Sequence, residues 1–178
     1  SSAGTVLLQN RDSLLPLDPN AHNITILVVG GEANYPTYGG HGSGGVQAPW
    51  LHKPGDGIRR AAGIAPGHDG DVECNERGLC VHVYLGNNGD GNYSTLAQYA
   101  SEAHVTILLT ATNSGEGKDR VSLSLGRRAN RTDVPDQYES IRVAAAHCAD
   151  TVVNIVTTGA VLTPWRTLPG VKAITTMF

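Results

Sequence analysis

Glu116 is the residue of this chain whose type and surroundings most clearly suggest chemistry. It lies in the segment NSGEGKDRVSLSL, residues 113–125, with a glycine on either side and with Asp119 and Arg120 shortly after it. A positioned carboxyl group can give a proton to a departing oxygen and later take one from water, provided that its surroundings hold its pKa near the working pH. That chemistry usually needs a second carboxylate nearby, and no other residue is an obvious partner. A solvated surface acid is therefore the competing interpretation of Glu116, and an ion pair within their own loop is the simplest one for Asp119 and Arg120.

A glycine-rich segment is the second candidate region, and it comprises Gly39, Gly40, His41, Gly42, Ser43, Gly44 and Gly45. Residues 40–45 match G-x-G-x-x-G on paper. A dinucleotide site needs those glycines in a tight turn between a strand and a helix, whereas here a long segment precedes them and Pro49 and Trp50 follow. The segment is better interpreted as a surface loop or as the wall of a neighbouring pocket.

Metal-binding residues do not form a recognisable pattern. The chain has seven histidines and three cysteines, but it lacks the H-x-x-x-H and C-x-x-C spacings that support a zinc site. We therefore expect neither a metal ion nor another cofactor.

The cysteines and the glycosylation motifs bear on the compartment. Cys74 and Cys80 lie in one polar segment and could close a small disulfide loop, whereas Cys148 lies on the apolar face of an expected helix and should be a buried free thiol. Three N-x-[ST] tripeptides occur, at Asn23, Asn92 and Asn130. Together these features favour a secreted or lysosomal-type compartment.

The composition is that of one globular domain. Hydrophobic residues make up 40% of the chain, and the formal net charge of −3 leaves no basic footprint for nucleic acid. No apolar run approaches the ~20 residues that a membrane span requires. We expect neither a nucleic-acid nor a membrane partner.

Short apolar runs alternate with helix-like segments along the chain. The expected strands are 23–31, 78–86, 104–112, 150–159 and 170–176, and the expected helices are 55–64, 94–103 and 135–148. This alternation predicts an α/β fold, a three-layer α/β/α sandwich with a mostly parallel sheet of five to six strands, flavodoxin-like. Because ligands meet the carboxyl ends of parallel strands, the loops that contain Ser43 and Glu116 should emerge at one edge of the sheet.

Three motifs carry a resemblance to a known family. AGTVLLQNRDSLLPL near the start, SGEGKDRVSLSL in the middle and GAVLTPW near the end occur in this order in the chain. They resemble the second, α/β-sandwich domain of the β-glucosidase type of glycoside hydrolase family 3, and the resemblance covers essentially all of residues 1–178.

The resemblance implies a retaining, exo-acting enzyme that hydrolyses terminal β-D-glucosides, with its nucleophilic Asp on a preceding barrel domain. Glu116 matches the acid/base, Asp119 and Arg120 match a pair that braces its loop, and Gly39–Gly45 resembles a loop that flanks the sugar site. Lys118 departs from the family pattern, which puts the aglycone side in doubt. β-Xylosidase and β-glucanase variants of the family are not separated by these motifs.

The chain is accordingly expected to be a fragment that lacks the barrel and has no turnover by itself. Its partners would be a carbohydrate substrate and the N-terminal barrel domain of the same protein. In the fragment we expect Glu116 to be exposed, with a pKa near the reference value of about 4.3. Two alternatives remain open: a non-catalytic glycan-binding or scaffold domain of the same fold, and a nucleotide-binding module.

Overall fold

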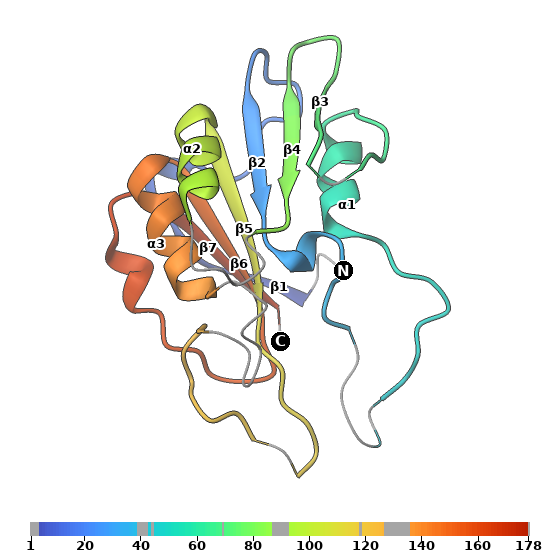
Figure 1. The fold of residues 1–178 in the computed structure, drawn as a ribbon, viewed down its shortest axis with the longest axis vertical. Helices are drawn as coiled ribbons and strands as arrows, with labels where there is room; N and C mark the ends of the chain where they lie inside the picture. Colours follow the sequence, from blue (N-terminus) through green and yellow to red (C-terminus); the bar gives the residue numbers. More distant parts are fainter. Residues whose placement is uncertain are drawn as a thin grey trace.

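The structure, a computed structural model, describes residues 4–38, 43, 45–68, 70–86, 93–117, 119–126 and 136–177. Its seven strands are β1 (Thr5–Asn10), β2 (Thr25–Val29), β3 (Val72–Cys74), β4 (Cys80–Tyr84), β5 (Val105–Ala111), β6 (Thr151–Val156) and β7 (Val171–Met177). Its helices are α1 (Pro54–Ala61), α2 (Ser94–Glu102) and α3 (Gln137–His147), with short 3₁₀ turns η2 (Arg11–Ser13), η3 (Gly31–Ala33) and η5 (Pro164–Thr167). Figure 1 shows these elements along the chain.

The strands form one sheet in the order β1-β7-β6-β5-β2-β4-β3. The central strands β4, β2, β5, β6 and β7 are parallel, and they are the five strands predicted from the sequence. Counted along the chain, their spatial order is 2-1-3-4-5, which is the flavodoxin order. The predicted fold class is therefore confirmed, although the sheet has seven strands instead of five to six.

The two additional strands are antiparallel and lie at the edges: β1 pairs with β7, and β3 pairs with β4. Most of β1 is exposed, and β3 has only three residues. Neither strand has an apolar run of four or more residues, which is the length that marks a strand buried on both faces, so neither was predicted from the sequence.

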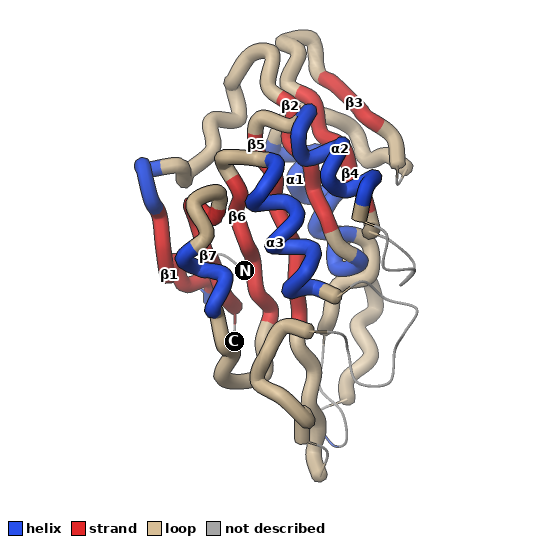
Figure 2. The backbone as a smooth tube through the Cα atoms, turned by 60° about the vertical axis from the view of Figure 1, so that its left-hand side comes forward, coloured by secondary structure: helices blue, strands red, loops and turns tan. Residues whose placement is uncertain are grey.

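Alternating side chains of the central strands pack on opposite faces of the sheet. On one face, Leu27 and Val29 of β2 pack with Leu96 of α2 and Ile141 of α3. On the other face, Ile26 and Val28 pack with Val81 and Val83 of β4 and with Ala62 and Ile64 at the end of α1. Figure 2 shows α2 and α3 in front of the sheet and α1 behind it. Because successive side chains of a strand point to opposite faces, a strand with apolar residues at every position requires helices on both sides.

The structure gives the bonding state of all three cysteines. Cys74 and Cys80 are directly opposite each other in the β3–β4 pairing and form a disulfide. Cys148, just after α3, is a buried free thiol, as predicted. No helix in the described part of the chain is long and apolar enough to span a membrane.

Candidate functional site at the carboxyl edge of the sheet

The carboxyl ends of β2 and β5 mark the place where the sheet changes winding direction. These strands are neighbours, but the chain leaves β2 towards α1 on one face and leaves β5 towards α3 on the other. Connections that diverge in this way mark the topological switch point of a sheet, which is where ligands bind in open parallel sheets. The residues of both candidate regions lie in these two connections, residues 30–53 and 112–136 (Figure 1).

Gly30 allows the first connection to begin close to the neighbouring strand. Its φ is +114°, and a Cβ atom at this position would lie 2.5 Å from the carbonyl oxygen of Leu109 in β5. Only glycine combines this backbone conformation with such a close approach. Gly30 therefore fixes where the chain turns out of the sheet towards the glycine-rich segment.

Glu116 and Ser43 bring the two connections into contact. The Oε2 atom of Glu116 accepts a hydrogen bond from the backbone N–H of Ser43 at 3.2 Å and another from the Ser43 hydroxyl at 2.9 Å. Both residues are exposed. The sequence prediction that these two loops meet at one edge of the sheet is thus confirmed for Ser43 and Glu116.

The pKa of Glu116 differs from the sequence expectation. The backbone N–H of Ser43, and after it the Ser43 hydroxyl, lower this pKa below its ordinary value by stabilising the charged form, and slight desolvation opposes them. The expectation of an unshifted value was wrong because it left out a partner that lies far away in the sequence. The carboxylate is exposed as expected, but two hydrogen bonds from Ser43 hold it in place.

The connection that contains Glu116 is braced by the connection after β6. Hydrogen bonds join the hydroxyls of Thr112 and Thr157 at 2.9 Å and those of Ser114 and Thr158 at 2.8 Å. Farther along, the backbone N–H of Leu162 donates to the carbonyl of Leu123 at 2.9 Å. Both ends of the segment around Glu116 are therefore fixed to an adjacent loop.

Arg120 takes part in this bracing in an unexpected way. Asp119 and Arg120 do not form an ion pair with each other, which corrects the simplest interpretation of the sequence. Arg120 instead donates through Nη2 to the carbonyl of Ala160. Through this bond Arg120 ties its loop to a neighbouring one, whereas a pair with the adjacent Asp119 would have tied the loop only to itself. The loop-support roles expected for Arg120 and Asp119 both remain predictions.

The remaining predicted positions are only partly described. Ser43 and Gly45 belong to the described residues, and both are exposed. The other members of the glycine-rich segment, and Lys118, lie outside the described residues: Gly39, Gly40, His41, Gly42 and Gly44. Thr157, Thr158 and Ala160 were not found by sequence reasoning, although they lie in or beside the GAVLTPW motif. Among the residues that the structure describes, no group of three or more His, Cys, Asp or Glu side chains could hold a metal ion.

Comparison with known proteins gives consistent results at the level of the domain. The family described as "Glycosyl hydrolase family 3 C-terminal domain" matches residues 5–178. Probable beta-glucosidase A of Neosartorya fischeri is 28% identical over 190 residues, which cover 97% of this chain and 20% of that protein.

Two solved structures have the same fold. The beta-D-glucoside glucohydrolase of Trichoderma reesei superimposes with a TM-score of 0.73 at 23% identity, over 97% of this chain and 25% of its own. The beta-glucosidase D2-BGL of Chaetomella raphigera gives 0.72 at 23% identity, over 96% of this chain and 24% of its own. The chain thus spans about a fifth to a quarter of the length of these three proteins.

Proposed function

The chain belongs to glycosyl hydrolase family 3, as a C-terminal domain of that family, and on this premise we propose that it supplies the acid/base carboxyl group, Glu116, of a retaining, exo-acting β-glucosidase. The proposed substrates are terminal β-D-glucosides, in keeping with the name of the curated relative. The rest of the active site, including the nucleophilic Asp, would lie on an N-terminal barrel domain of the parent protein.

The position of Glu116 is the observation that carries this proposal. The residue is exposed where the β2 and β5 connections meet, and its Oε2 atom accepts both hydrogen bonds from Ser43. Within the described residues, Oε1 accepts no hydrogen bond. One oxygen is therefore anchored and the other is available to hold a proton that faces a ligand.

Retaining hydrolysis needs two carboxyl groups about 5 to 5.5 Å apart across the glycosidic bond. In the first step Glu116, protonated, donates its proton to the departing glycosidic oxygen while the Asp of the barrel attacks the anomeric carbon. In the second step the Glu116 carboxylate takes a proton from water as the water cleaves the glycosyl-enzyme. The flanking glycines, Gly115 and Gly117, leave no side chains beside Glu116 to obstruct the sugar.

The lowered pKa of Glu116 is unfavourable for the first step of the reaction in the isolated domain. Ser43 favours the ionised carboxylate, whereas the first step needs the protonated acid. A second carboxylate close by and the exclusion of water both raise a carboxyl pKa, and in this proposal both come from the barrel. The isolated chain lacks these influences as well as the nucleophile.

Exposed apolar side chains at the same edge support a partner domain there. The segment between β2 and α1 exposes Tyr35, Tyr38, Val46, Trp50 and Leu51, and the loops after β5 and β6 expose Val121, Leu123 and Leu162. Trp50 is 71% exposed and Val121 is 90% exposed. Large apolar side chains gathered on loops at one edge are typical of a surface that is covered in the intact protein.

The test is the Glu116→Gln variant of the parent protein, assayed on two β-glucosides. One has a dinitrophenyl leaving group, which needs no proton, and the other has an alkyl leaving group, which does. We expect the rate of glucosyl transfer from the alkyl glucoside to fall about 10²- to 10⁴-fold, the usual contribution of general acid catalysis, and the dinitrophenyl glucoside to be affected far less in this step. Added azide should restore turnover of the dinitrophenyl glucoside and give a β-glucosyl azide.

Glu76→Gln is the matched control, because Glu76 is an exposed acid in the β3–β4 turn at the opposite edge of the sheet. It should leave both activities unchanged. Equal losses on the two substrates in Glu116→Gln would refute the acid role. If the unaltered parent binds glycans but cleaves neither substrate, the alternative of a non-catalytic glycan-binding domain is the correct one.

The proposal also places the parent protein in a secreted or lysosomal-type compartment. The disulfide between Cys74 and Cys80 supports this placement, because such bonds persist where the surroundings are oxidising.

A further inference from the structure

Asn23 lies at the amino edge of the sheet, opposite the carboxyl edge where Glu116 lies. It is exposed and precedes β2, whose first residue is Thr25, and so Asn23-Ile24-Thr25 forms an N-x-[ST] acceptor tripeptide at the amino ends of the parallel strands. Of the three such tripeptides in the chain, this one lies wholly in the described residues. In Figure 1 this edge is at the top of the sheet, far from the loops that contain Glu116.

The local geometry leaves the Asn23 amide group available. The backbone N–H of Asn23 donates to the carbonyl of Arg77 at 3.1 Å, which fixes the residue with a φ of +55°. Its Oδ1 atom lies beside Gly78, where an added Cβ atom would be 2.6 Å away. Among the residues that the structure describes, neither the Asn23 side-chain amide nor the Thr25 hydroxyl forms a hydrogen bond. The nitrogen that would carry a sugar is therefore not used by the fold.

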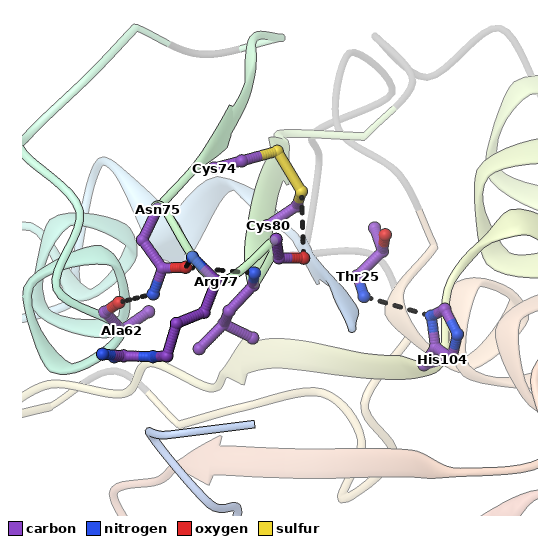
Figure 3. The surroundings of a disulfide bond; sticks show 9 residues. Thr25, Ala62, Cys74, Asn75, Arg77, Cys80 and His104 are labelled. Atoms are coloured by element: carbon purple, nitrogen blue, oxygen red, sulfur yellow. Dashed lines mark hydrogen bonds between the residues drawn. A yellow bond between two sulfur atoms is a disulfide. The ribbon is translucent and has the colours of Figure 1, made fainter. Parts of the chain in front are cut away.

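The neighbouring disulfide is an independent indication of the compartment. Cys74 and Cys80 close the β3–β4 turn that holds Arg77 and Gly78 beside Asn23, and Figure 3 shows this bond with Arg77, Thr25 and His104 around it. The oxidising compartments in which structural disulfides form include the one in which asparagine side chains receive glycans.

We propose that Asn23 is an N-glycosylation site of this protein. In this step the Nδ2 atom of Asn23 attacks the anomeric carbon of a lipid-pyrophosphate-linked oligosaccharide. An N–C bond forms, the C–O bond to the pyrophosphate breaks and its electron pair leaves with the lipid pyrophosphate, while Nδ2 loses one proton to a base of the transferase. The glycan then projects from the edge of the sheet opposite Glu116, where it does not obstruct access to this residue.

A purely conformational role for Asn23 is the competing explanation, since asparagine tolerates a positive φ better than most residues. Two substitutions at Thr25 separate the explanations because they leave Asn23 in place. Thr25→Val removes the hydroxyl that the N-x-[ST] tripeptide requires but keeps a β-branched residue at the start of β2. Thr25→Ser keeps the tripeptide.

The experiment uses the full-length parent protein, secreted from a eukaryotic host and digested with peptide N-glycosidase in ¹⁸O-labelled water. Mass spectrometry of the peptide that contains Asn23 should show ¹⁸O-labelled aspartate at this position in most molecules of the parent protein and of Thr25→Ser. The label should be lost in Thr25→Val, whose hydrolysis of β-glucosides should equal that of the parent. Unmodified Asn23 in secreted protein whose Cys74–Cys80 bond is intact would overturn the inference, whatever the state of Asn92 and Asn130. This readout does not depend on glucosidase activity.

Discussion

The chemistry proposed for single residues rests on the contact between Ser43 and Glu116. One of the two hydrogen bonds comes from the backbone of Ser43, so any residue except proline could supply it, and the other comes from the serine hydroxyl. Both reach the same carboxylate oxygen. The backbone N–H of Ser43 therefore contributes most to the lowered pKa of Glu116, and the serine hydroxyl adds to it.

Replacing Ser43 by alanine should raise the pKa of Glu116 in the isolated chain. The backbone N–H that contributes most to the lowering remains, so the increase should recover only part of the shift. Titration of the Glu116 carboxyl carbon by NMR measures the effect. Ser122→Ala is the control, because the Ser122 hydroxyl donates to Ser124 and does not contact Glu116. An identical Glu116 pKa in both variants would contradict the role given to the Ser43 hydroxyl.

His82 should make the folded domain sensitive to mild acid. Its side chain is buried on β4, its ring centroid lies 4.4 Å from that of Tyr99, and its Nε2 atom has no hydrogen-bond partner among the described residues. Burial lowers the pKa of His82, Glu102 opposes this, and Arg59 adds to it. The folded state therefore favours neutral His82, and the corresponding stability is fully present above about pH 6.5 and is lost as the pH falls through the lower, folded-state pKa.

Urea unfolding between pH 7.5 and pH 5 tests this dependence. His82→Phe, which keeps an aromatic ring against Tyr99, should reduce the loss of unfolding free energy by about 1.4 kcal/mol for each unit of pKa difference. His22→Gln, which changes an exposed histidine, should leave the pH dependence as it is. If His82→Phe loses as much stability as the unaltered chain over this range, another group is responsible.

Among the elements, the pairing of β2 with β5 decides where the site can form. Both connections that contain candidate residues leave from this pair, and they diverge because α1 and α3 lie on opposite faces of the sheet. Hydrogen bonds to the loop after β6 then hold the β5 connection in place. The location of the candidate site is therefore a consequence of strand order, and the braces determine how accurately Glu116 is positioned.

Gly30→Ala should destabilise the sheet at this junction. The substitution would place a Cβ atom 2.5 Å from the Leu109 carbonyl and would force a φ that alanine avoids, so we expect a loss of about 3 kcal/mol or more. Gly31→Ala is a closely matched control, because nothing lies within 4 Å of its added Cβ atom, and it should change the stability by less than about 0.5 kcal/mol. Urea denaturation at constant pH measures both. Equal effects would show that β2 and β5 do not approach as described.

For the whole molecule, the carboxyl edge is the surface that the proposal leaves incomplete. Its loops expose several large apolar side chains together with the carboxylate that would do the chemistry. The opposite edge has the disulfide and Asn23 instead. The proposed functions are thus separated along the strand direction, with the partner domain at one end and the glycan at the other.

Hydroxyl-radical footprinting should show that the partner domain covers this edge. In the isolated chain Trp50, which is 71% exposed, should be oxidised readily, and Trp165, which is 1% exposed, should be protected. In the parent protein both tryptophans should be protected, with Trp165 serving as the internal control. Equal oxidation of Trp50 in the two proteins would mean that the barrel does not pack against this edge.

Local sequence patterns were sufficient to predict the features that depend on residues close together in the chain. The five parallel strands are apolar runs buried on both faces, and α3 (Gln137–His147) lies within the expected helix 135–148. Both features follow from side-chain periodicity. The motif around Glu116 likewise indicated the candidate acid and the family from the sequence alone.

Contacts between distant parts of the chain were decided only by the tertiary structure. The pairing of β1 with β7, the two hydrogen bonds from Ser43 to Glu116 and the choice of Ala160 instead of Asp119 by Arg120 all join residues that are far apart in the sequence. Their physical reason is common to all three. A hydrogen-bonding group takes the partner that the packed sheet brings within reach, and no local periodicity encodes which partner that will be.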